Sequence, residues 1–141
     1  MGVLIRTLFL VLCLLFYTNA FALDVLKSTA GMYISQDKAS GGAAGLASLS
    51  QTAQVGVNAE SQSFHVGNDG NQEVSLTYSV YNNASWLSCD PTSGEATTEQ
   101  DLITINYVTT KLKTGIYKGK IYIRSDYSGW AFIDVYLTVT E

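Results

Sequence analysis

The chain has little cysteine, proline or histidine: its 141 residues include two cysteines, one proline and one histidine. The one histidine, His65, follows Phe64, and no nearby pattern places a serine nucleophile and an aspartate around it as a catalytic triad requires. A metal site built on His65 and Cys89 lacks the further ligands it needs. We therefore expect a protein that is not an enzyme and that binds no metal and no cofactor.

Basic residues are also scarce, with 8 Lys and Arg against 12 Asp and Glu and a formal net charge of −4. With this net negative charge, the sequence does not predict the basic surface that binding to the phosphates of a nucleic acid requires. Most of the basic residues form one cluster in the sequence, which comprises Lys111, Lys113, Lys118, Lys120 and Arg124. This cluster could bind an acidic glycan or the acidic loop of a neighbour, or its charge could protect an exposed strand edge against aggregation. The spacing of four acidic residues matches no known calcium loop, so we interpret them as a solvated loop; they are Asp90, Glu95, Glu99 and Asp101.

A hydrophobic run lies near the beginning of the chain. Arg6 precedes an apolar core at residues 8–17, and Ala20-Phe21-Ala22 matches the small-x-small cleavage rule. We interpret residues 1–22 as a secretory signal peptide, because the core is short for a membrane span and no stop-transfer segment or basic cluster follows it. The expected product is secreted, to the periplasm or the extracellular space, with no membrane attachment after cleavage. Its formal net charge falls from −4 to −5, because the cleaved segment contains one basic residue and no acidic one.

Cleavage also removes Cys13 and leaves Cys89 alone. A secreted domain with one thiol has no internal disulfide, so packing alone must stabilise it. Cys89 shares a strand face with Leu87, which favours a small buried hydrophobe. The other interpretation is an exposed thiol that links two copies.

The texture of the sequence changes once after the signal peptide. Residues 23–45 are small and polar and indicate a flexible lead-in rich in Gly, Ala and Ser. The sequence allows a short strand or helix near residues 32–34 of this segment. Residues 46–141 alternate in the manner of strands, with turn clusters about every eight to twelve residues. They predict an all-β fold, an antiparallel immunoglobulin-like sandwich of about seven strands, at 47–55, 62–66, 74–81, 86–89, 102–108, 117–125 and 131–140.

Two segments combine an apolar anchor with turn residues. Trp86-Leu87 leads into Pro91-Thr92-Ser93-Gly94, and a Leu-x-x-Gly-x-Tyr-x-Gly-x-Ile segment follows at residues 112–121. The pair resembles the BACON family, bacterial immunoglobulin-like modules of secreted and surface proteins whose name records a proposed carbohydrate-binding role. The resemblance covers residues 46–140 and implies the sandwich fold. Modules of this family often lie beside enzymes, whereas we expect this module to be the functional unit on its own.

Four residues receive structural roles in this interpretation: Trp86, Gly94, Gly115 and Tyr117. We expect Trp86 to fill the core where the two sheets meet. Tyr117, two residues after Gly115, resembles the tyrosine corner of Greek-key sandwiches, whose hydroxyl ties a crossing loop to the strand. Gly94 and Gly115 belong to the predicted turns. The run Asn68-Asp69-Gly70-Asn71 predicts a hairpin between two antiparallel neighbours.

Alternation in the last two strands assigns their faces. A turn at residues 125–129 sets Tyr122 opposite Phe132, Lys120 opposite Asp134 and Lys118 opposite Tyr136, and every buried residue opposite a buried one. The outward side chains form a stripe of aromatic residues beside cations. The candidate ligand-binding residues are Tyr122, Phe132, Tyr136, Tyr127, Trp130 and Lys120.

An exposed aromatic stripe has three possible uses. Sugar rings stack their apolar face on aromatic side chains while polar neighbours bond the hydroxyls, which points to a glycan or polysaccharide partner. Outward aromatics also stabilise strand pairing by roughly 0.2 to 1 kcal/mol per cross-strand pair, or they pack on another copy or surface protein. We expect a secreted, non-catalytic binding or adhesion module that recognises glycans. The alternative is a structural subunit of a surface or extracellular assembly whose segment 23–45 pairs with the edge strand of a neighbour.

Overall fold

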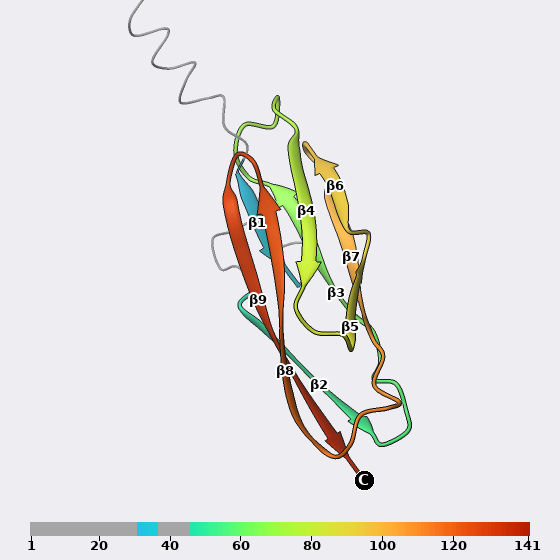
Figure 1. Ribbon diagram of the computed structural model, residues 1–141. Helices are drawn as coiled ribbons and strands as arrows, with labels where there is room; N and C mark the ends of the chain where they lie inside the picture. Colours follow the sequence, from blue (N-terminus) through green and yellow to red (C-terminus); the bar gives the residue numbers. More distant parts are fainter. Residues whose placement is uncertain (1–30, 37–45) are drawn as a thin grey trace, which may run out of the picture.

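The computed structural model describes residues 31–36 and 46–141 of the chain (Figure 1). These residues form nine strands and no helix, and they contain no helix long and apolar enough to cross a membrane. The predicted signal peptide and most of the predicted lead-in lie outside the described residues. The all-β class expected from the sequence is confirmed.

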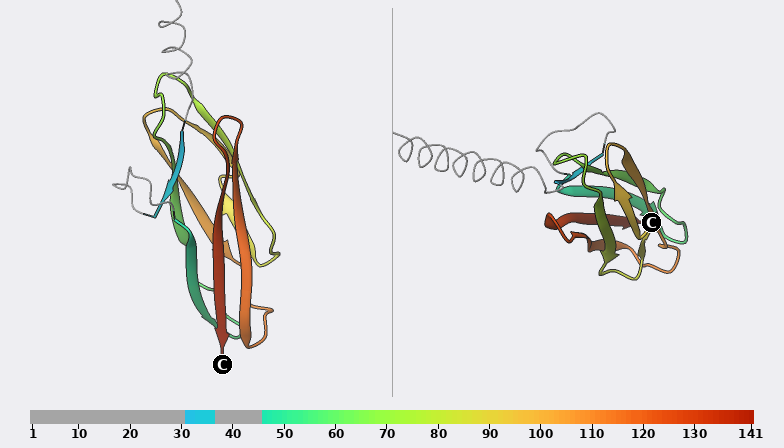
Figure 2. Two further views of the ribbon diagram at one scale, coloured as in Figure 1. Left: turned by 90° about the vertical axis from the view of Figure 1, so that its left-hand side faces the viewer. Right: turned by 90° about the horizontal axis from the view of Figure 1, so that it is seen from above.

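The nine strands form two sheets (Figures 1 and 2). One sheet has four strands in the order β1-β3-β7-β5, and the other has five in the order β2-β9-β8-β4-β6. The bounds are β1 (Met32–Ser35), β2 (Ser48–Gln54), β3 (Gln62–Asn68), β4 (Leu76–Asn82), β5 (Leu87–Asp90), β6 (Ser93–Ala96), β7 (Gln100–Tyr107), β8 (Gly115–Ser125) and β9 (Gly129–Thr140). The longest strands, β8 and β9, run side by side along most of the molecule (Figure 2).

The core lies between the inner faces of the two sheets. The inward alternation predicted for β8 and β9 is confirmed, and β4 adds three core residues. The almost completely buried residues of these strands are Leu76, Tyr78, Val80, Ile121, Ile123, Ile133, Val135, Leu137 and Val139. The second sheet contributes Phe64, Val66, Ile103 and Ile105. Cys89 is also buried, and burial raises the pKa of its thiol to about 11. The interpretation of Cys89 as an exposed thiol that links two copies is therefore wrong.

Two strands were not among the seven predicted. Strand β1 pairs antiparallel with β3, and Ile34 from it is buried in the core. The predicted domain boundary at residue 46 omits this strand, because four residues among small polar ones show no sustained alternation. Strand β6 occupies part of the predicted Pro-Thr-Ser-Gly turn and pairs with β4 at the sheet edge. Gly94 therefore lies in a strand opposite Tyr78, not in a turn.

One predicted neighbour relationship was wrong, and one strand pair departs from the antiparallel pattern. The turn at 68–71 does not join a hairpin, because β3 and β4 belong to different sheets; the Asn68 side chain instead bonds the backbone of the crossing loop, accepting from Gly70 and donating to Asn71 and Val74. The sandwich is also not purely antiparallel. Strand β2 runs parallel to β9 at one edge of the five-stranded sheet.

The residues of the two sequence motifs meet in the core. Trp86 is buried and packs against the rings of Tyr107 and Tyr117, with centroid distances of 6.3 and 6.4 Å. A Cβ atom on Gly119 would collide with Leu87 and approach Trp86, so this glycine makes room for the motif. The Tyr117 hydroxyl donates to the Lys113 carbonyl oxygen at 2.9 Å, as in a tyrosine corner. Gly115 begins β8 at φ 155°, a conformation that favours glycine.

Candidate functional site

The register of β8 and β9 determines the candidate site. Tyr122 pairs with Phe132, Lys120 with Asp134 and Lys118 with Tyr136, and Ser125 pairs with Gly129 at the turn. This is the predicted register, and it is confirmed. Because inward and outward side chains alternate along each strand, all these residues except Ser125 and Gly129 lie on the outer side of the five-stranded sheet.

We call one part of this surface the aromatic face; it comprises Tyr81 of β4, Tyr122 of β8, and Trp130, Phe132 and Tyr136 of β9. Strand β4 pairs with β8 so that Tyr81 lies opposite Tyr122. Tyr81, Tyr122 and Phe132 therefore form one row across three adjacent strands. Four of the five aromatic side chains are exposed, by 51% for Tyr81, 53% for Trp130, 49% for Phe132 and 38% for Tyr136.

The rings of the aromatic face contact one another. Phe132 meets Tyr122 edge to face, with centroids 5.6 Å apart and an interplanar angle of 86°. Trp130 and Phe132 are nearly parallel, at 2°, with centroids 6.5 Å apart. Tyr81 lies 6.5 Å from Trp130 across the sheet. Four rings thus form a continuous platform, while Tyr136 lies two outward positions beyond Phe132 along β9, with Asp134 between them.

Three cations of β8 lie over the rings of β9. The Lys118 Nζ is 5.5 Å from the Tyr136 centroid, and the Lys120 Nζ is 5.6 Å from that of Phe132. The Arg124 guanidinium carbon is 5.8 Å from the Trp130 centroid. These distances are within the range of cation–π attraction, so each outward ring of β9 carries a positive charge beside it.

Two acidic residues partner these cations. Lys120 and Asp134 form an ion pair at 2.8 Å, and the hydrogen bond to Asp134 raises the pKa of Lys120. Arg124 and Asp126 are 3.4 Å apart, with both side chains more than half exposed. Lys118 forms no ion pair within the described part of the chain. The positive charge on this face is therefore only partly compensated.

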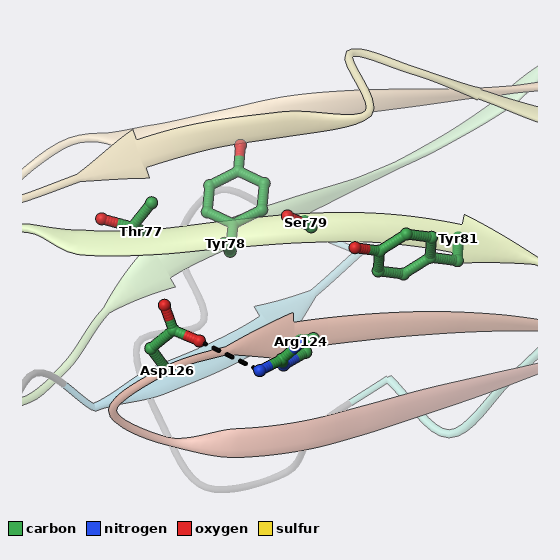
Figure 3. Close-up of a pocket in the computed structure, with 6 residues that line it drawn as sticks. All are labelled: Thr77, Tyr78, Ser79, Tyr81, Arg124 and Asp126. Carbon is green, nitrogen blue, oxygen red and sulfur yellow. Dashed lines mark hydrogen bonds and ion pairs between the residues drawn. The ribbon is translucent and has the colours of Figure 1, made fainter.

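A shallow hollow of about 250 Å³ adjoins the aromatic face at the end near the β8–β9 turn (Figure 3). Thr77, Ser79 and Tyr81 of β4 line it, with Arg124 of β8 and Asp126 of the turn. Figure 3 shows the contact between Arg124 and Asp126 as a dashed line. The hollow thus combines three hydroxyl groups with the Arg124 guanidinium and the Asp126 carboxylate, beside the ring of Trp130.

The structure brings four of the six predicted ligand-binding residues together, because Tyr122, Phe132, Trp130 and Lys120 are in contact. Tyr136 lies farther along β9 beside Lys118, and Tyr127 lies in the β8–β9 turn; neither has a ring contact with the other described aromatics. Residues missing from the predicted site are Tyr81, Ser79, Lys118 and Arg124. No local pattern indicated that β4 pairs with β8 and sets Tyr81 beside Tyr122.

The arrangement supplies the two elements of a sugar site. Exposed rings offer apolar faces for the C–H face of a sugar, and hydroxyl, ammonium and guanidinium groups offer hydrogen bonds to its oxygens. These groups also stabilise the pairing of β8 with β9, because Trp130 lies opposite Arg124 and Tyr136 opposite Lys118 as cation–π pairs.

The remaining titratable residues lie elsewhere. Of the acidic loop residues, Asp101 accepts a hydrogen bond from Tyr78, Glu95 accepts one from Ser75, and Glu99 accepts from Thr97, which lowers the pKa of Glu99 to about 2. No group of three His, Cys, Asp or Glu side chains in the described ranges could hold a metal ion. His65 is half-buried on β3.

The fold is similar to that of several solved structures. The PapD-like domain 7 of human CEP192 aligns with a TM-score of 0.59 and 11% identity over 80% of this chain and 87% of that one. A GH5 xyloglucanase of Bacteroides ovatus, in complex with a XXXG heptasaccharide, aligns at 0.55 and 13% identity over 79% of this chain, which spans 19% of the enzyme. The periplasmic chaperone SfaE aligns at 0.55 and 6% identity, over 79% and 58% of the two chains. These likenesses show the fold alone.

A family comparison identifies the module more closely. None of the curated proteins matches the chain. The model of the viral BACON domain matches residues 50–126, which is more than half of the chain and includes both motifs. The expected BACON type is confirmed, but the family is a viral one, and the bacterial origin expected from the resemblance is not supported. The chain belongs to the viral BACON domain family.

Proposed function

We propose that this chain is a secreted, non-catalytic module that binds glycans through the aromatic face. The observation that carries the proposal is the set of three outward rings on β9, each with a cation of β8 beside it. A platform of exposed rings with hydrogen-bonding groups at its border matches the two chemical surfaces of a sugar. Membership in a BACON family supports a carbohydrate as the ligand.

The exposure of the platform favours a ligand over a purely structural role. Trp130, Phe132 and Tyr81 each leave about half of their side-chain surface in solvent. Contiguous exposed apolar surface on a small domain marks a contact site more often than chance exposure does. A glycan that covers these rings removes apolar area from water, which contributes about 25 cal/mol per Å².

Binding should be measured with the mature chain from Leu23 against a panel of neutral and acidic soluble polysaccharides, by affinity electrophoresis and calorimetry. We expect Trp130→Ala combined with Phe132→Ala to abolish binding, because the continuous platform is lost. Leu102→Ala is the matched control, since Leu102 is a similarly exposed apolar side chain on the four-stranded sheet. Retention of full affinity by the double variant, or the absence of any glycan ligand, would refute the proposal.

The competing assembly role makes a different prediction. In that hypothesis the segment 23–45 pairs with a neighbour, yet residues 32–35 of this segment already pair with β3 of the same chain. We therefore expect the mature chain to be monomeric in sedimentation experiments. A stable oligomer that dissociates on deletion of residues 23–45 would favour the assembly role.

Secretion is part of the proposal and rests on the sequence of residues 1–22. We expect the full chain, produced in a bacterium with two membranes, to appear in the periplasm or medium. Mass spectrometry should give a product that begins at Leu23. A cell-associated product that keeps residues 1–22 would contradict this part.

A further inference from the structure

We infer that the ligand is an acidic glycan chain, and that the hollow at Arg124 binds one of its carboxylates. This inference rests on the proposed glycan-binding function and specifies its ligand class. It comes from the distribution of charge over the sheet, from the incomplete pairing of Arg124 and from the position of Lys118.

Charge on the molecule is segregated. The described residues contain ten acidic side chains and five basic ones, and the five basic ones all lie between residues 111 and 124. Three of them project from β8 onto the aromatic face, where the acidic neighbours of the rings are Asp126 and Asp134. An acidic protein thus keeps its most basic surface on the face with the exposed rings. Such a surface attracts anionic ligands.

Arg124 keeps most of its hydrogen-bonding capacity for a ligand. Its contact with Asp126 is 3.4 Å, longer than the 2.7 to 2.9 Å typical of charge-assisted hydrogen bonds. The guanidinium carries five N–H donors in a planar fork that fits a carboxylate with two parallel bonds. The open hollow beside it is lined with hydroxyl groups of Thr77, Ser79 and Tyr81, which can bond sugar oxygens. A carboxylate at Arg124 therefore places its own sugar ring beside Trp130.

Lys118 indicates that the ligand is a chain and not a single sugar. It forms no ion pair with any described residue, whereas Lys120 is already paired with Asp134. Lys118 and Arg124 lie six residues apart on one extended strand, a separation of roughly 20 Å at about 3.3 Å per residue. One sugar contacts only one of these cations. A glycan that lies along β8 and β9, with a carboxylate at each end, contacts both and covers Phe132 between them.

The experiment compares acidic polymers with uncharged counterparts of the same backbone. The probes are polygalacturonate, alginate and hyaluronate, each beside a carboxyl-reduced form in which the carboxylates are primary alcohols. We expect at least one polymer to bind the mature chain about tenfold more tightly than its reduced form, with an affinity that falls as salt rises. Arg124→Gln should lose about tenfold, and Lys118→Gln about threefold, on the acidic form only.

Two controls separate the fork geometry from charge. Arg124→Lys keeps the positive charge but loses the planar fork. We therefore expect its affinity for the acidic polymer to lie between that of the wild type and that of Arg124→Gln. Lys111→Gln and Lys113→Gln make the same charge change outside the aromatic face and should leave affinity unchanged. Equal losses from these variants would show that net charge alone governs binding, which overturns the site at Arg124.

The outcomes distinguish this inference from the proposed function. If the chain binds neutral glycans or the reduced polymers as tightly as the acidic ones, and Trp130→Ala with Phe132→Ala abolishes that binding, the acidic ligand class is wrong while glycan binding stands. If no polymer of either kind binds, both proposals fall.

Discussion

The hydroxyl of Tyr78 on β4 donates a 2.7 Å hydrogen bond to Asp101 on β7 and so joins the two sheets. Tyr78 is almost completely buried, and burial together with Asp101 raises its pKa above the ordinary tyrosine value. Gly94 lies against both groups, and a Cβ atom there would collide with the Tyr78 hydroxyl and with Asp101. A part-buried polar contact thus links the two sheets at this point.

Tyr78→Phe tests this contact. The substitution keeps the ring but removes the donor, so we expect the free energy of unfolding to fall by about 1 to 2 kcal/mol. Urea unfolding followed by tryptophan fluorescence measures the change. Tyr127→Phe serves as the control, because Tyr127 is exposed in the β8–β9 turn. An equal effect of the two variants would show that the hydroxyl of Tyr78 contributes nothing specific.

Gly94→Ala should also destabilise the fold, by about 1 to 3 kcal/mol, because the added methyl group displaces Tyr78 and Asp101. We expect the cost to be smaller in a chain that already carries Tyr78→Phe, since the oxygen nearest to the new methyl group is then absent. A double-mutant cycle measures this coupling. Strictly additive effects would mean that the steric conflict lies elsewhere.

Tyr117→Phe removes the hydrogen bond from the Tyr117 hydroxyl to the Lys113 carbonyl oxygen. We expect a loss of about 1 kcal/mol in stability, with glycan affinity unchanged because Tyr117 is not part of the aromatic face. Chemical denaturation and calorimetry provide the two measurements. A loss of affinity at unchanged stability would instead assign Tyr117 to the binding site.

Alkaline pH should destabilise the protein through Cys89. Burial raises the pKa of its thiol from 9.0 to about 11, and burial followed by the charge of Cys89 raises the pKa of Tyr107 from 10.0 to about 12. Above pH 9 the unfolded chain releases these protons more readily than the folded one. Stability is therefore complete below pH 9 and falls as pH rises toward 11.

Cys89→Val identifies the part of this fall that belongs to the thiol. Valine has no proton to release, so the urea midpoint of the variant should decline less between pH 8 and pH 10.5 than that of the wild type. The same decline in both proteins would assign the alkaline sensitivity to the tyrosines Tyr78 and Tyr107.

The local sequence pattern was sufficient to predict the buried and exposed faces of β8 and β9 and the register in which these two strands pair. Apolar residues alternate with polar ones in β8 and β9, and the apolar face of each strand is the one that packs in the core. The alternation therefore shows which side chains are buried. The length of the turn at residues 125–129 and the pairing of Lys120 with Asp134 then select the register. The stripe Tyr122, Phe132, Tyr136 and Lys120 was predictable for this reason.

Short edge strands were not predictable in the same way. Strands β1 and β6 have four residues each and bury few apolar side chains, so neither shows a period that can be read. Their pairing depends on a neighbouring strand that offers free backbone groups, which is information held by the rest of the fold.

The sequence by itself determined seven of the nine strands, which faces of the last two strands are apolar, and how β8 pairs with β9. The tertiary structure decided the order of the strands in each sheet, including the passage of the chain from β3 to β4 between sheets and the pairing of β4 with β8. That pairing adds Tyr81 to the aromatic face and creates the hollow at Arg124. The reason is physical: an amphipathic strand buries the same apolar face beside any neighbour, so only the packing of the whole core selects among them.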